Sequence, residues 1–412
     1  MEKQIEKKKK KKKAQRWIKP RHTPIKWILQ MTFGQYCKLR YRIKITPLSE
    51  KHERQYLVLY NHQTAYDQFF VGLAFKKPLY YIASEDIFSM GFLSKLIKFL
   101  VEPIPIKKQA TDVRSMLNCM KVVKEGGSIA LAPEGNRTYS GKTEYIKPSI
   151  VSLIRALKLP VAFYKLEGGY GVHPRWSDKV RRGRMKGGIS RILEIDEINA
   201  MSDEELLSVV EREMYVNEGV VDGEYHTKYQ AEYLERAIYV CPECGLSEFE
   251  SEEDIISCKR CGLTVRYTPT KELVGVGRDF PFRFVTEWYE YQKKFVNEFD
   301  LLANTESAIY CDSARLSEVI LYKNKRVISD DASISLFGDR IEVKYGDEEL
   351  LLDFANTSSV AVLGKNKVNV YHKDRVYQFK GNERFCGLKY VNLYFRYKNL
   401  TSEVENEQFL GL

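Results

Sequence analysis

The stretch Gln55-Tyr-Leu-Val-Leu-Tyr60-Asn-His62-Gln-Thr-Ala-Tyr-Asp67 decides the fold class of this sequence. It begins with a strand-like run over 55–60, apolar from Tyr56 to Tyr60, and passes within a few residues into a helical pattern over 65–75. A short apolar run of this length predicts a strand, and the spacing that follows predicts a helix. Strands that alternate with helices are typical of α/β domains with a mainly parallel sheet.

The same alternation extends on both sides of this stretch. Further strands are predicted at 79–83, 127–132 and 160–164, and helices at 112–124 and 149–158, where apolar residues recur every three or four positions. The first helix is expected to begin near Thr23 and Pro24, with the threonine as its cap. Residues 23–236 are therefore expected to form an α/β domain with a mixed, mainly parallel sheet and flanking helices.

Length and composition indicate that further domains follow. The chain has 412 residues, 44% hydrophobic and 29% charged, so a disordered chain and a single small module are both excluded. We expect a cysteine-containing segment at 237–268, a linker helix within 269–300 and a β-rich domain at 301–412.

Short alternating runs separated by turn residues predict the strands of this last domain. They lie at 318–322, 333–337, 340–345, 349–353, 367–371 and 376–379, and a closing helix is expected over 382–397. The pattern is similar to that of pleckstrin-homology-like domains. An inert stabilising module is the alternative, because a fold by itself carries no function.

Four of the eight cysteines form two Cys-x2-Cys pairs, Cys241 with Cys244 and Cys258 with Cys261, separated by thirteen residues. This spacing is typical of a four-cysteine zinc ribbon. Four thiolates close a tetrahedral site and leave no open position for a substrate, so we expect structural zinc. Two disulfides are the alternative, disfavoured because nothing else in the sequence indicates export.

Positive charge is concentrated near the N-terminus. The formal net charge is +11, and residues 1–22 hold 11 Lys or Arg against 2 Glu. The run from Lys7 to Lys13 repels itself and is expected to be a disordered arm. Trp17 and Trp27 follow it, and cations beside apolar groups are typical of an interfacial anchor. We expect contact with an anionic membrane surface rather than nucleic acid, and a solvated tail is the alternative.

Nothing in the sequence predicts a membrane span or export. The longest apolar stretch, 69–75, is far shorter than the ~18–20 residues that a spanning helix needs. The lysines at the N-terminus are not followed by the apolar segment of a signal peptide. We therefore expect a cytoplasmic protein, peripheral on the cytoplasmic face of the membrane.

Two histidines precede an aspartate with four residues between them: His62 with Asp67, and His173 with Asp178. Spacing alone does not separate the pairs. Context favours His62, because it follows a strand, and open α/β sheets build their sites at the carboxyl ends of strands. Asp67 would hold one ring nitrogen while the other faces a substrate, as a neutral general base requires. A histidine that only caps a helix or is satisfied in the fold is the alternative.

A second block follows the strand 127–132 and is expected at the same edge of the sheet. Glu134-Gly135-Asn136-Arg137-Thr138 offers a carboxylate, a glycine and a guanidinium. An arginine fork and exposed backbone amides suit a phosphate group. A surface arginine in a turn is the alternative.

Together these blocks resemble those of the glycerolipid acyltransferases typified by 1-acyl-glycerol-3-phosphate acyltransferase. Asn61-His62 to Asp67 is similar to the family's His-x4-Asp block, and 133–138 to its Glu-Gly-Thr-Arg-Ser block. Two weaker blocks, 103–108 and 159–161, occur in the family's order. This chain has Asn136 and Thr138 where the family usually has Thr and Ser, and lysines where an arginine is common in the third block.

The resemblance implies transfer of a fatty acyl group from an acyl thioester, acyl-CoA or acyl carrier protein, to the free hydroxyl of a lysophospholipid. The expected acceptor is 1-acyl-glycerol-3-phosphate, which gives phosphatidic acid. It implies His62 as general base and Asp67 as its orienting group. It also implies an acceptor-binding set: Glu134, Gly135, Asn136, Arg137, Lys107 and Lys108.

The sequence leaves alternatives for the basic residues at 179–186 and for the function of the chain. The basic residues at 179–186 would meet phosphates of the donor or anionic lipid, or form a solvated face. The alternative function is a catalytically inactive, membrane-associated zinc-ribbon adaptor. A specific nucleic-acid partner is not expected, because the charge outside the arm is only +2.

Overall fold

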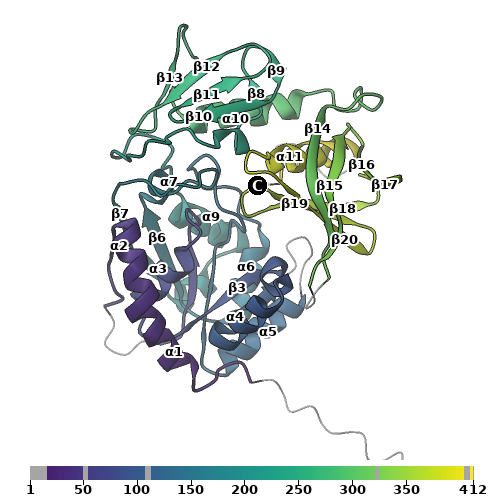
Figure 1. Ribbon diagram of the computed structural model, residues 1–412. Helices are drawn as coiled ribbons and strands as arrows, with labels where there is room; N and C mark the ends of the chain where they lie inside the picture. The colour runs from purple at the N-terminus through teal and green to yellow at the C-terminus, as the bar shows by residue number, and fades with distance from the viewer. Residues whose placement is uncertain (1–15, 50–53, 107–112, 321–323, 403–408, 412) are drawn as a thin grey trace, which may run out of the picture.

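The computed structural model describes residues 16–49, 54–106, 113–320, 324–402 and 409–411. The expected basic arm from Lys7 to Lys13 lies outside these residues, as do Lys107 and Lys108. The described chain forms three parts: an α/β domain, a small β-sheet unit above it and a curled sheet beside both (Figure 1).

The α/β domain contains a seven-stranded sheet in the order β1-β7-β6-β2-β5-β3-β4. Its strands are β1 Ile43–Ile45, β2 Leu57–Tyr60, β3 Leu79–Ser84, β4 Ile104–Ile106, β5 Ser128–Leu131, β6 Val161–Glu167 and β7 Met185–Leu193. Neighbouring strands are parallel except β6 and β7, which pair antiparallel. The mixed, mainly parallel sheet predicted from the sequence is confirmed.

Helices cover both faces of this sheet, which explains why its strands are apolar at consecutive positions. Leu57 and Leu59 of β2 belong to one buried cluster, whereas Val58 and Tyr60 belong to a second cluster on the opposite face. The helices are α1 His22–Leu29, α2 Gln35–Tyr41, α3 Asp67–Ala74, α4 Phe92–Val101, α5 Val113–Lys124, α6 Ser149–Leu157, α7 Gly169–Val172, α8 Ile195–Ala200 and α9 Asp203–Met214. The first helix begins at His22, and a π-helical turn over Gln30–Gly34 joins it to α2.

The cysteine-containing segment forms a short hairpin and a four-stranded antiparallel sheet. The hairpin pairs β8 Val240–Cys241 with β9 Gly245–Leu246. The sheet contains β10 Phe249–Glu252, β11 Ile255–Cys258, β12 Thr264–Tyr267 and β13 Leu273–Gly275. Strand β13 extends this sheet past residue 268, into the segment expected as a linker, before helix α10 Val285–Glu298.

The C-terminal part is a seven-stranded antiparallel sheet in the order β17-β16-β15-β14-β20-β19-β18. Its elements are β14 Tyr310–Glu318, β15 Arg326–Leu336, β16 Arg340–Tyr345, β17 Glu348–Asp353, β18 Thr357–Leu363, β19 Lys367–His372, β20 Arg375–Gly381 and the closing helix α11 Gly387–Thr401. The expected β-rich domain with a closing helix is present. Its likeness to pleckstrin-homology-like domains stays a prediction.

Two strands of this part differ from the sequence prediction. Strand β14 ends at Glu318, where the strand expected at 318–322 was to begin, and its buried positions are Tyr310, Ala314 and Leu316; residues 321 and 322 lie outside the described residues. Strand β18 was missed because it begins with the polar run Thr-Ser-Ser, in which the hydroxyl of Thr357 donates to the carbonyl of Asp353.

One buried cluster runs through the cysteine-containing sheet, α10 and the C-terminal sheet. It includes Val265, Trp288 and Leu316 and reaches Tyr139 and Trp176 of the α/β domain. The last two parts of the chain therefore share a core and form one body that packs against the α/β domain.

Candidate active site

The two sequence blocks with polar side chains meet at the carboxyl ends of neighbouring strands, as the parallel sheet requires. His62 follows β2, and the block from Glu134 to Thr138 follows β5, which pairs with β2. The backbone N–H of Thr138 donates to the carbonyl of His62 at 3.2 Å. The structure thus brings together residues that lie more than 70 positions apart in the sequence.

The imidazole of His62 is held by Asp67, whose Oδ2 lies 2.8 Å from His62 Nδ1. Asp67 is fully buried at the start of α3 and also accepts the backbone N–H groups of Gln63 and Thr64, at 2.7 and 2.9 Å. The hydroxyl of Thr64 donates to it at 2.5 Å. These bonds fix the carboxylate, so His62 donates through Nδ1 and keeps its lone pair on Nε2.

The ring of His62 is partly accessible, with 24% of the side chain exposed. Burial lowers the pKa of His62, and the charges of Arg137 and Arg175 lower it further, while Asp67 raises it. The imidazole is therefore neutral at physiological pH. A neutral, oriented imidazole with a free Nε2 can accept a proton from a hydroxyl group.

Glu134 holds the loops around His62 together. Its Oε1 accepts the backbone N–H of His62 at 3.0 Å, and its Oε2 accepts that of Glu144 at 3.1 Å. Burial raises the pKa of Glu134 to about 8, although the two backbone N–H groups lower it. Both carboxyl oxygens are engaged inside the protein, so in this structure Glu134 positions His62, whereas the resemblance implied acceptor binding.

Arg137 presents a cationic group without a partner. Its Nε and Nη2 are buried and have no hydrogen-bond partner among the described residues. Burial, together with the neighbouring Arg175, lowers the pKa of Arg137 to about 10. Gly135 closes the turn that starts at Ala132 and has φ +70°, where a side chain would be strained, and Asn136 follows it, partly exposed. An unpaired, partly desolvated guanidinium attracts an anion such as a phosphate.

His173 and Asp178 do not form a pair in the structure. Asp178 binds Arg236 at 2.8 Å and Lys365 at 2.5 Å, while His173 Nδ1 lies 3.1 Å from the hydroxyl of Tyr41. Burial, together with the charges of neighbouring cations including Arg137, lowers the pKa of His173 to about 3. His173 therefore sits beside the site as a neutral group.

The structure brings three further residues to the surroundings of Arg137: Arg175 and Lys365, which sequence reasoning missed, and His173, which it set aside in favour of His62. Arg175 Nη1 donates to the carbonyl of Arg137 at 2.8 Å. Both Arg137 and Lys365 influence the pKa of His173. The only sequence signal near Arg175 and His173 was the His-x4-Asp spacing of residues 173–178. No sequence signal marked Lys365 as a site residue.

The four paired cysteines converge in space. The Sγ atoms of Cys241, Cys244, Cys258 and Cys261 all lie within 4.8 Å of one another. Cys241 and Cys261, and likewise Cys244 and Cys258, have Sγ atoms 3.6 Å apart. Zinc–sulfur bonds of ~2.3 Å in a tetrahedron place the sulfurs ~3.8 Å apart, so the donor set fits zinc.

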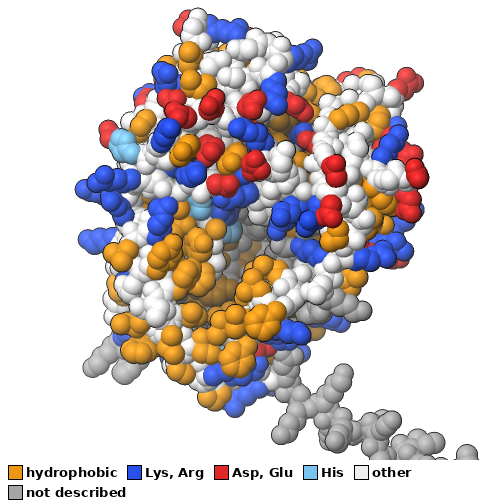
Figure 2. Space-filling model, in the orientation of Figure 1, with side chains coloured by type: hydrophobic (Ala, Val, Ile, Leu, Met, Phe, Trp, Pro, Cys, Tyr) orange, Lys and Arg blue, Asp and Glu red, His pale blue; other side chains and the backbone are white. Residues whose placement is uncertain are grey.

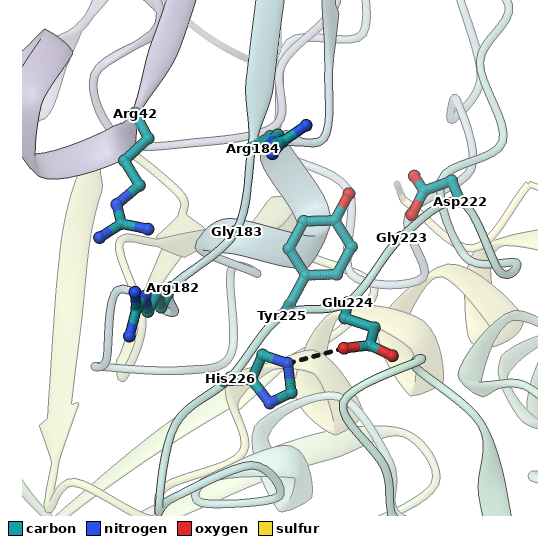
Figure 3. Close-up of a pocket in the computed structure, with 9 residues that line it drawn as sticks. All are labelled: Arg42, Arg182, Gly183, Arg184, Asp222, Gly223, Glu224, Tyr225 and His226. Carbon is teal, nitrogen blue, oxygen red and sulfur yellow. Dashed lines mark hydrogen bonds and ion pairs between the residues drawn. The ribbon is translucent and has the colours of Figure 1, made fainter.

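One of the basic residues at 179–186 is buried and bonds to the backbone, whereas the others are exposed to solvent. Arg181 is buried and donates to the carbonyl of Gln230 at 2.6 Å. Arg182 and Arg184 are exposed, and with Arg42 they line a pocket of about 630 Å³ (Figure 3). None of these three guanidinium groups forms an ion pair with a carboxylate in the described part of the chain.

One of the comparisons with known proteins, the family match, covers the two sequence blocks of this site. Residues 42–163 match the family model described as Acyltransferase. A solved structure, the 1-acyl-sn-glycerophosphate (LPA) acyltransferase PlsC from Thermotoga maritima, is 19% identical with a TM-score of 0.40, over 48% of this chain and 80% of that chain. No curated protein matches the sequence. The match over residues 42–163 agrees with the resemblance to the glycerolipid acyltransferases that the sequence blocks carry.

Proposed function

We propose that the protein transfers a fatty acyl group from an acyl thioester to the free hydroxyl of 1-acyl-glycerol-3-phosphate, which gives phosphatidic acid. The observation that carries the proposal is the neutral His62, fixed by Asp67, beside the unpartnered guanidinium of Arg137. One group suits a hydroxyl that must lose a proton, and the other suits a phosphate on the same molecule.

In the reaction, Nε2 of His62 accepts the proton of the acceptor hydroxyl while its oxygen attacks the thioester carbonyl carbon. The tetrahedral intermediate collapses with cleavage of the carbon–sulfur bond, and the departing thiolate takes the proton from the imidazolium. Asp67 stabilises the imidazolium between these steps. The acyl group passes directly to the acceptor, with acyl-CoA or acyl carrier protein as donor.

An exposed apolar surface supports docking on a lipid bilayer, where such an acceptor resides. Large apolar side chains of α1, the π-helical turn, α2 and α4 are exposed to solvent: Trp27, Ile28, Met31, Tyr36, Leu39, Phe92, Leu93, Leu96 and Phe99. Figure 2 shows apolar side chains around a hollow on the part of the molecule where Figure 1 places these helices. An apolar patch of this extent marks an interaction surface.

Among the described residues, no helix combines the length and apolar character needed to cross a bilayer. Because the apolar side chains named above are exposed, we propose peripheral binding to the cytoplasmic face of the membrane. The basic arm from Lys7 to Lys13 would add attraction to anionic headgroups.

The test is acyl transfer on phospholipid vesicles, with labelled acyl-CoA or acyl carrier protein as donor. Wild type should acylate 1-acyl-glycerol-3-phosphate, and His62→Ala should be slower by about a hundredfold or more. His226→Ala is the matched control, since His226 also bonds a carboxylate, Glu224, but is exposed. Unchanged turnover in His62→Ala, or none in wild type with either donor, would contradict the proposal.

A further inference from the structure

The hairpin formed by β18 and β19 of the C-terminal sheet reaches the candidate active site. The carbonyl of Val362 accepts a hydrogen bond from Arg175 Nη2 at 3.5 Å. At the hairpin's turn, Lys365 Nζ lies 2.5 Å from Asp178 Oδ1, although the two residues are 187 positions apart. The C-terminal domain therefore contacts the segment 173–178 that borders the site.

These contacts continue to Arg137. Arg175 is buried between the two domains, and its Nη1 donates to the carbonyl of Arg137 at 2.8 Å. Its guanidinium also lies 4.2 Å from the ring centroid of Tyr139. Arg175 thus connects the backbone of the Arg137 loop to the backbone of the hairpin.

The same region carries more positive than negative charge. The described residues place five cations there, Arg137, Arg175, Arg181, Arg236 and Lys365, against the carboxylates of Asp67, Asp178 and Glu144. Glu134 adds little negative charge at neutral pH, because burial raises its pKa to about 8. Five positive charges against at most three negative ones leave an excess of at least two positive charges.

The region also contains buried polar atoms without a hydrogen-bond partner among the described residues. His173 is 6% exposed, and its Nε2 has no hydrogen-bond partner among the described residues, like Nε and Nη2 of Arg137. Burial lowers the pKa of Lys365, and the charges of Arg137 and Arg236 lower it further, whereas Asp178 raises it. A bound dianion would relieve the repulsion among these cations and satisfy the unpaired donors.

We infer that the C-terminal β-rich domain is part of the acceptor site. The β18–β19 hairpin completes the anion subsite around Arg137, and Lys365 favours acceptors that end in a phosphate monoester over those with a phosphodiester. The reason is charge: a monoester brings about two negative charges at neutral pH, a phosphodiester brings one, and the subsite has an excess of at least two positive charges. This inference rests on the proposed function for its choice of acceptor.

The test compares Lys365→Met with Lys380→Met, which removes an exposed lysine from β20 of the same sheet. Lys365→Met should raise KM for 1-acyl-glycerol-3-phosphate about tenfold, with little change in kcat, because one charge-assisted contact is lost. KM for 1-acyl-glycerophosphocholine should change less than twofold. Lys365→Arg should restore the wild-type KM, and an unchanged melting temperature would show that the variants are folded.

A second measurement does not depend on catalysis. Binding of glycerol 3-phosphate by calorimetry should weaken about tenfold in Lys365→Met and stay unchanged in Lys380→Met. Weakened binding in a protein that acylates no lysolipid would support the anion subsite while the proposed function fails. If Lys365→Met and Lys380→Met behave alike in both measurements, or if both acceptors lose affinity equally, the inference is overturned.

Discussion

Replacing Asp67 with asparagine should slow acyl transfer about a thousandfold and leave the fold intact. The carboxylate lies 2.8 Å from His62 Nδ1 and faces the positive charge that the ring gains in the transition state. A pair of unit charges ~4 Å apart interacts by about 4 kcal/mol at an effective dielectric constant of ~20. Loss of about 4 kcal/mol of transition-state stabilisation corresponds to a thousandfold in rate, since each ~1.4 kcal/mol is tenfold.

The pH dependence of the rate gives a second signature. Asp67 raises the pKa of His62, so its removal should lower that pKa further below the ordinary value. A general base works only when unprotonated, so activity is lost as the pH falls through the pKa of His62. The acidic limb of the kcat/KM profile should therefore move to lower pH in Asp67→Asn, while the rate on the plateau falls.

The assay is steady-state transfer from acyl-CoA on vesicles between pH 4.5 and 8. Glu224→Gln is the matched control, because Glu224 binds the exposed His226 at 2.9 Å and should leave the rate unchanged. A loss below tenfold in Asp67→Asn, or an acidic limb that moves to higher pH, would refute the assignment of His62 and Asp67 as base and orienting group.

Two further predictions concern the rest of the chain. Metal analysis should find about one zinc per chain. The variant Cys258→Ser should lose the zinc and have a lower melting temperature, because Cys258 belongs to the core shared with the C-terminal sheet. Zinc retained in this variant would contradict the four-cysteine site. Leu39→Asp and Phe92→Asp, at 80% and 81% exposure, should each weaken vesicle binding by ~30-fold or more at high salt, since burial of one such side chain contributes about 2–3 kcal/mol. Tyr215→Asp, exposed on another part of the surface, is the control, and equal binding of all three variants would place the docking surface elsewhere.

Much of the fold could be predicted because its signals are local. The apolar run of β2 and the spacing in α5 and α6 come from side chains within a few turns of one another. The C-terminal part was harder, because its strands are half exposed and their apolar signal is weaker. Strand β18 begins with Thr357 and two serines, and the hydroxyl of Thr357 bonds to the backbone. Such residues are typical of turns, so the start of this strand carries no strand signal.

The sequence by itself determined those parts of the candidate sites in which the interacting residues lie close together along the chain. His62 and Asp67 are five positions apart, and each cysteine pair spans one tight turn, so backbone geometry alone brings them together. Glu134 and Arg137 were found because both blocks follow parallel strands, although the sequence did not show that Glu134 braces the backbone of His62.

Only the tertiary structure decided which distant groups join this site. Lys365 reaches Asp178 across 187 residues, and no periodicity or spacing encodes that contact. It depends on how the C-terminal sheet packs through the shared core onto the α/β domain. The exposed apolar side chains of α2 and α4 could not be predicted either, because a helical sequence pattern shows that a helix has an apolar face but not whether another element covers that face. Packing between elements sets both outcomes, and packing is a property of the whole fold.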